Sequence, residues 1–181
     1  ESIAPMLTLV MALAVAKGIR QTLRRDSREA AAKVGIKWPN DIVVDGKKVC
    51  GILTEMSMEQ GYIHHIVIGV GINVRRQEFS EEIRERAAAI DEQCGFCISR
   101  SQLIADIMEA FEEDYEIFLQ THDLKGLRDS YAKLLLNQDR EVCVLDPKGE
   151  YRGIARGIND QGELIVEGKD GTGKAAHLYN T

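Results

Sequence analysis

Two segments of the chain carry apolar residues at helical spacing. In residues 5–24 and 101–119 such residues recur every three or four positions, which predicts two helices with one apolar face each. Two shorter segments, 79–90 and 124–136, also predict helices, and Ser80 is a candidate N-cap for the first of them. The part of the chain before residue 137 is therefore expected to be rich in helix.

Between these segments the apolar pattern changes to one typical of β-strands. Runs rich in β-branched residues occupy positions 33–37, 42–44, 49–53 and 65–74. Asp45-Gly46 separates the second run from the third, and this dipeptide favours a tight two-residue hairpin. The run 65–74 is almost continuously apolar, which predicts a strand that is buried on both faces.

The pattern changes again near residue 137. From residue 141 onward about five short strands alternate with turn residues, and the clearest lie at 142–145, 151–157, 164–167 and 176–179. Short strands at this spacing predict a small β-barrel of the SH3-like kind. We therefore predict an α/β domain over residues 1–136 and a barrel over residues 137–181.

Composition narrows the class of protein. The chain has 181 residues, a formal charge of −6 and a hydrophobic fraction of 44%, as expected for a globular protein. An acidic chain is poorly suited to bind a nucleic-acid backbone through these residues. The apolar stretch 4–16 is shorter than the roughly 20 residues needed to cross a membrane, and no basic segment precedes it. We expect a cytoplasmic protein with no membrane partner and with reduced cysteines.

The predicted hairpin at 42–53 carries the clearest candidate chemistry. A two-residue turn would place Val43 opposite Lys48 and Asp41 opposite Cys50, with all four side chains on one face. Asp41 and Lys48 would then be diagonal neighbours about 7–8 Å apart, a distance that a lysine side chain spans. A solvated surface ion pair is the simplest explanation of such a pair in isolation.

The residues around this pair favour a functional explanation. Residues 37–41 read Lys-Trp-Pro-Asn-Asp, residues 51–53 after Lys48 read Gly-Ile-Leu, and residues 69–74 read Gly-Val-Gly-Ile-Asn-Val. In this order and spacing, and followed by a helical segment and a small β region, they resemble the signature of the biotin–protein ligases. The resemblance extends over nearly the whole chain.

The resemblance implies a fold, a reaction and its participants. The fold would be α/β, a mixed sheet with flanking helices like that of the class II aminoacyl-tRNA synthetases, followed by the SH3-like barrel. The reaction would be ATP-dependent attachment of biotin to a lysine through biotinyl-5′-AMP, with Mg²⁺ required. The acceptor would be the biotin carboxyl carrier protein or domain of acetyl-CoA carboxylase or of another biotin-dependent carboxylase.

The resemblance also implies roles for individual residues. Lys48 would contact the biotin carboxylate and the reacting phosphate, and Asp41 would orient Lys48 or receive the carrier lysine. Trp38 is interpreted as structural rather than as a wall of the pocket. The remaining candidates are glycines and asparagines, with no protein ligand to a metal among them: Gly51 and Gly69 for biotin, and Asn40, Gly71 and Asn73 for ATP.

One family feature is not found in the sequence. The glycine- and arginine-rich loop that covers the substrates in this family lies upstream of the first helix seen here. We therefore expect a piece of a longer ligase with little activity of its own; an N-terminal DNA-binding module and a homodimer are left open. The alternatives are a lipoate-type acyl-protein ligase and a non-catalytic binding or dimerisation module.

Overall fold

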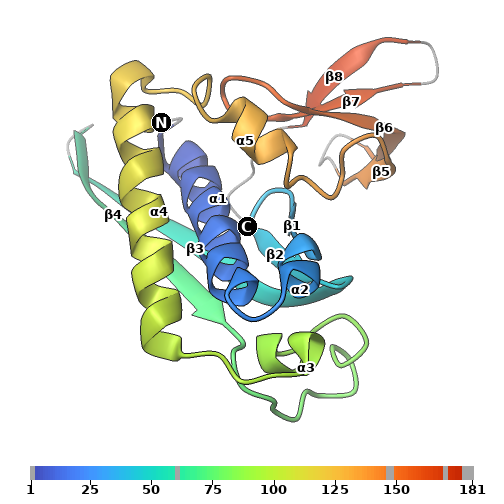
Figure 1. Cartoon of the computed structure of the whole chain (residues 1–181). Helices are drawn as coiled ribbons and strands as arrows, with labels where there is room; N and C mark the ends of the chain where they lie inside the picture. Colours follow the sequence, from blue (N-terminus) through green and yellow to red (C-terminus); the bar gives the residue numbers. More distant parts are fainter. Residues whose placement is uncertain (1–2, 60–61, 146–148, 169–170, 177–181) are drawn as a thin grey trace.

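The computed structural model describes residues 3–59, 62–145, 149–168 and 171–176. Two four-stranded sheets, in the orders β1-β2-β3-β4 and β5-β6-β7-β8, are joined by helical segments (Figure 1). The elements are α1 (Ile3–Arg24), α2 (Arg28–Ala32), β1 (Val34–Lys37), β2 (Asp41–Val44), β3 (Lys47–Glu59), β4 (Tyr62–Ile72), α3 (Ile90–Cys94), α4 (Arg100–Thr121), α5 (Arg128–Ala132), β5 (Glu141–Val144), β6 (Tyr151–Ile158), β7 (Leu164–Glu167) and β8 (Gly173–Ala176).

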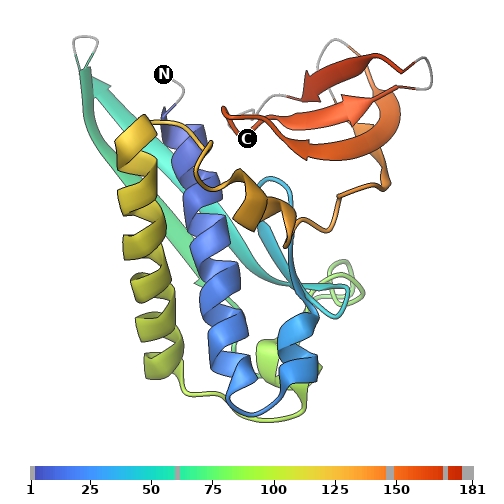
Figure 2. The ribbon, with the colours of Figure 1, turned by 45° about the horizontal axis from the view of Figure 1, so that its top comes forward.

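Helix α1 is the centre of the molecule. It packs along α4, and both helices lie over the same face of the first sheet (Figure 2). At 22 residues it is longer than the apolar stretch expected from the sequence, and its length and composition alone would allow it to cross a membrane. Most of its side chains are buried inside the protein, however, so it serves here as a core helix.

The first sheet confirms the predicted strands but not their predicted environment. All pairings between the named strands are antiparallel, and among the described residues parallel pairing is limited to two isolated bridges, Ile36 with Leu135 and Lys48 with Ala87. The described strands therefore do not form the expected mixed sheet. Neighbouring strands are joined by short connections, which favour antiparallel pairing. Strand β4 is not buried on both faces, since helices cover only one side of the sheet; Val67, for example, is 52% exposed.

Two of the predicted helices are largely wrong, for one physical reason. Residues 81–86 form turns, and this segment bonds to the sheet: the Lys48 amide donates to the Arg86 carbonyl at 2.7 Å. The helix expected over 124–136 is confined to α5, because the Leu136 amide donates to the Ile36 carbonyl of β1 at 2.8 Å. Hydrogen bonds to a sheet therefore replaced those of a longer helix.

The C-terminal strands form an antiparallel sheet among the described residues. Strands β5, β6 and β7 lie where the sequence predicted them, whereas β8 begins at Gly173, earlier than the strand expected at 176–179. Residues 177–179 lie outside the described part of the chain. Ala155 and Leu164 of this sheet belong to the same apolar cluster as α1. The parts of the chain before and after residue 137 therefore share one continuous core.

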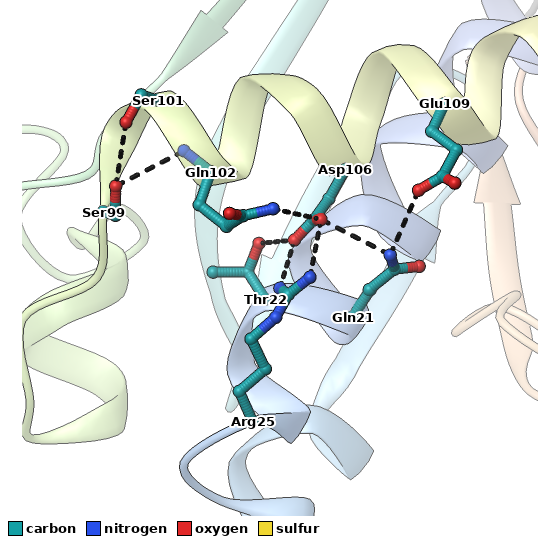
Figure 3. A network of polar contacts seen from close by, with 8 residues as sticks. All are labelled: Gln21, Thr22, Arg25, Ser99, Ser101, Gln102, Asp106 and Glu109. Carbon is teal, nitrogen blue, oxygen red and sulfur yellow. Dashed lines mark hydrogen bonds and ion pairs between the residues drawn. The ribbon is translucent and has the colours of Figure 1, made fainter.

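A buried carboxylate joins α1 to α4 (Figure 3). Asp106 of α4 is 2% exposed and accepts hydrogen bonds from Thr22 at 2.6 Å, from Gln102 at 3.0 Å and from both terminal nitrogens of Arg25. Burial alone would raise the pKa of Asp106, but these donors outweigh burial and lower the pKa to about 2. The charged form is therefore the one that stabilises the helix pair.

We predict that Asp106→Asn lowers the free energy of unfolding by about 2–3 kcal/mol, because Arg25 and Thr22 would lose a buried charged acceptor. Urea denaturation at pH 7 measures this loss. Glu109→Gln is the matched control, one turn along α4 and exposed, and should change stability by less than about 0.5 kcal/mol.

The pH dependence of that loss follows from the direction of the pKa shift. A carboxyl group whose pKa is lowered by folding stabilises the folded state above its ordinary pKa of 3.8. The difference between wild type and Asp106→Asn should thus shrink as the pH falls from about 4 toward 2. A difference that stays constant over this range would contradict the role given to the Asp106 charge.

Candidate active site

The sheet face that the helices leave open carries a shallow groove of about 530 Å³. Strands β3 and β4 form its floor, and Gly51, Gly69 and Gly71 keep the floor free of side chains. Its lining residues come from the three sequence motifs: Asn40, Lys48, Gly51, Ile52, Leu53, Gly69, Val70 and Gly71. Five of the residues predicted to bind substrates are thus brought together.

An ion pair stands at the rim of the groove. The Nζ atom of Lys48 lies 2.6 Å from Oδ1 of Asp41, as the hairpin geometry predicted. The side chains are 47% and 20% exposed, so the pair adds little to stability. The ion pair instead determines where the lysine lies. It holds the ammonium group beside an open, glycine-lined surface, where that group can attract a carboxylate or a phosphate.

The register of the hairpin differs from the prediction by one residue beyond Lys48. Val43 does pair with Lys48, but a β-bulge next to this pair places Asp41 opposite Gly51 and Ile42 opposite Cys50. Cys50 therefore does not share the face of Lys48; it is 1% exposed and lies in the core. Burial is the largest cause that raises the pKa of the Cys50 thiol to about 12, which makes it an unreactive structural cysteine.

Gly51 occupies the position that Cys50 was expected to fill. A Cβ atom added to Gly51 would lie 3.3 Å from both Cε and Nζ of Lys48 and 3.9 Å from the Asp41 carboxylate. Even a methyl group would therefore press on the lysine. Glycine at this position lets the Lys48 side chain lie flat across β3 and reach Asp41.

The two asparagines predicted near the nucleotide have different environments. Asn40 lines the groove and is fixed to β3, because its Nδ2 atom donates to the Ile52 carbonyl at 2.8 Å. Asn73 is not among the residues that line the groove, and its Oδ1 atom accepts a hydrogen bond from Gln77 at 2.9 Å. The structure thus brings Asn40, but not Asn73, to the groove that Lys48 lines.

Sequence reasoning missed the backbone hydrogen bonds that join Lys48 to Arg86 and Ala88. The Lys48 amide donates to the Arg86 carbonyl at 2.7 Å, and the Lys48 carbonyl accepts from the Ala88 amide at 3.0 Å. These residues lie in the segment for which a helix was predicted, so the sequence carried no signal for the pairing. The lysine backbone is consequently fixed on both sides, and only its side chain remains adjustable.

A larger groove of about 780 Å³ lies on the helical side, between α1, α4 and α5. It is richer in charge, but its Lys17 and Arg25 already pair with the carboxylates of Asp114 and Asp106. None of the motif residues line it. The smaller groove at Lys48 is therefore the better candidate for the active site, because the motif residues line it and include a partly exposed lysine.

Most of the chain matches models of known protein families. Residues 1–73 match the biotin/lipoate A/B protein ligase family, and residues 139–176 match the biotin protein ligase C-terminal domain. The bifunctional ligase/repressor BirA of Bacillus subtilis is 37% identical over 94% of this chain and 50% of its own length. BirA of Escherichia coli is 31% identical over 89% of this chain and 48% of its own length.

A solved structure agrees with these sequence matches. Biotin protein ligase from Aquifex aeolicus in complex with biotin and ATP has a TM-score of 0.77 and 26% identity, covering 94% of this chain and 67% of that one. The chain spans about half the length of the curated relatives it matches. Two family models in the expected order, the BirA relatives and the shared architecture show that the chain belongs to the biotin protein ligase family.

Proposed function

We propose that the protein containing this chain attaches biotin to a lysine of a carrier protein in an ATP-dependent reaction. The observation that carries the proposal is the 2.6 Å contact between Asp41 and Lys48 at the rim of a glycine-floored groove. The related Aquifex structure holds biotin and ATP. The match of residues 139–176 to a biotin protein ligase domain favours biotin over lipoate.

The chemistry has two steps, and the first places two anions in contact. The biotin carboxylate attacks the α-phosphorus of ATP, which forms biotinyl-5′-AMP and releases pyrophosphate. The lysine amine of the carrier then attacks the acyl carbon, so that an amide forms and AMP leaves. The repulsion between carboxylate and phosphate must be offset by a cation in a fixed place.

Lys48 supplies that cation in our proposal. Its ammonium group would bridge the biotin carboxylate and the α-phosphate, with a contact that strengthens as charge develops on the phosphate oxygens. Asp41 would keep Lys48 over the groove in the absence of substrate, and could receive a proton from the carrier lysine. The glycines of the groove floor would let the biotin and the adenylate approach the backbone closely.

The two asparagines would both act on the nucleotide, but their positions support these roles unequally. Asn40 would contact the nucleotide from the end of the groove, where its side chain already lies. Asn73 has weaker support, because it does not line the groove and its Oδ1 atom is already bonded to Gln77.

Magnesium would enter with the nucleotide. The described residues contain no group of three or more His, Cys, Asp or Glu side chains able to hold a metal ion. Asp41, the carboxylate beside the groove, is already paired with Lys48. These residues do not form a cage for Mg²⁺, which commonly binds through phosphates and water with only one or two carboxylates, so we assign no step to it.

Several broader features belong to the same proposal. The catalytic part would occupy residues 1–136, with a fold related to the class II aminoacyl-tRNA synthetases, and residues 137–181 would complete an SH3-like barrel. The protein would act in the cytoplasm on the biotin carboxyl carrier domain of acetyl-CoA carboxylase or of a related carboxylase. Neither a membrane nor a nucleic acid would be bound by this part of the protein.

We predict that Lys48→Ala in the full-length protein lowers the rate of adenylate formation by at least about 100-fold, because the reacting anions lose their cation. Biotin-dependent exchange of labelled pyrophosphate into ATP measures this step. Lys47→Ala is the matched control, since Lys47 is the adjacent residue and does not line the groove. Exchange near the wild-type rate in Lys48→Ala would show that the assignment is wrong.

A further inference from the structure

Trp38 is held by the C-terminal half of the chain from two directions. Its backbone amide donates to Oδ1 of Asn137 at 3.0 Å, and its indole Nε1 donates to the carbonyl of Gly162 at 2.9 Å. Asn137 lies before β5, and Gly162 lies in the turn between β6 and β7. The first residue of the Trp-Pro-Asn turn is thus fixed by segments 99 and 124 residues away in the sequence.

The acceptor for the indole is itself rigid. Gly162 has a φ of +82°, a conformation that favours glycine, and its amide donates to the Asn159 carbonyl at 3.0 Å. The Asn159 side chain closes the same turn by accepting from the amides of Gln161 and Glu163. Asp160 in this turn is tied to the catalytic half, because its carbonyl accepts from the Leu124 amide at 2.8 Å.

The chain from Trp38 to the ion pair is fixed residue by residue. The hydroxyl of Tyr131 donates to the Pro39 carbonyl at 3.4 Å. Asn40 makes two hydrogen bonds with Ile52 of β3, one through its side chain at 2.8 Å and one through its carbonyl at 3.1 Å. Asp41 follows directly and contacts Lys48, so a short hydrogen-bonded segment connects Trp38 to the ion pair.

We propose that Trp38 is a positioning residue, through which the C-terminal sheet sets the orientation of the Asp41–Lys48 pair; this inference rests on the proposed ligase function. Packing alone does not account for the geometry. Trp38 is half-buried, and an indole at such a site could donate to water instead of to a fixed carbonyl. The C-terminal sheet thus contributes to the reaction without touching the groove.

The test is Trp38→Phe in the full-length protein, which keeps an aromatic ring but removes the indole N–H. We expect kcat for biotin-dependent pyrophosphate exchange to fall about tenfold, because a misplaced Lys48 loses contact with the transition state. The KM values for biotin and ATP should change less than about threefold, because binding in the groove is largely retained. A merely structural role would lower the melting temperature and leave kcat at its wild-type value.

Arg128→Ala is the matched control. Arg128 pairs with Asp160 at 2.7 Å and so links the same two parts of the chain without touching the segment from Trp38 to Asp41. This variant should keep the wild-type kcat, although it also loses a polar contact between the parts of the chain before and after residue 137. Equal losses of kcat in Arg128→Ala and Trp38→Phe would overturn the specific role of Trp38.

Asn137→Ala provides a second route to the same residue, and it keeps the proposal testable if Trp38→Phe does not fold. It removes the acceptor of the Trp38 amide and should also lower kcat, and its effect should not add fully to that of Trp38→Phe. Wild-type kcat in both variants would overturn the inference alone. Absence of exchange in the full-length wild-type protein would instead overturn the proposed ligase function.

Discussion

The contact on which this structure's chemistry depends is an ion pair across a bulged hairpin. A bare lysine on an open sheet would sample many directions, and its charge would be spread over a wide volume of solvent. Asp41 restricts that freedom through the ion pair, and the absence of a side chain at Gly51 leaves room for Lys48 to reach Asp41. The bulge places these three residues on one face, while Cys50 turns into the core.

Stability and candidate chemistry depend on opposite faces of the first sheet. Helices α1 and α4, which the buried Asp106 network joins to each other, cover one face of the first sheet. The opposite face stays open and carries the groove at Lys48. A rigid, well-packed face lets the other face retain partly exposed charged groups that contribute little to folding. The contacts from the C-terminal sheet to Trp38 extend this support to the edge of the site.

Local patterns predicted much of this arrangement. The two long helices, the four strands of the first sheet, and the meeting of Asp41 with Lys48 all follow from periodicity and from one Asp-Gly turn. Features that depend on distant hydrogen bonds were not predictable. The bulge inserts one residue without any composition signal, and the segment around Arg86 has helical spacing yet bonds to Lys48 of β3. Asn73 matches a family motif by position, but its contact with Gln77 depends on where the following loop turns.

In our proposal, Asp41 and Lys48 act as one unit during adenylate formation. A double-mutant cycle with Asp41→Asn and Lys48→Ala, followed by pyrophosphate exchange in the full-length protein, measures their coupling. If Asp41 acts by holding Lys48, the double variant should be no slower than Lys48→Ala alone. Losses that multiply, so that the double variant is slower than Lys48→Ala by the full effect of Asp41→Asn, would show that the two residues act independently.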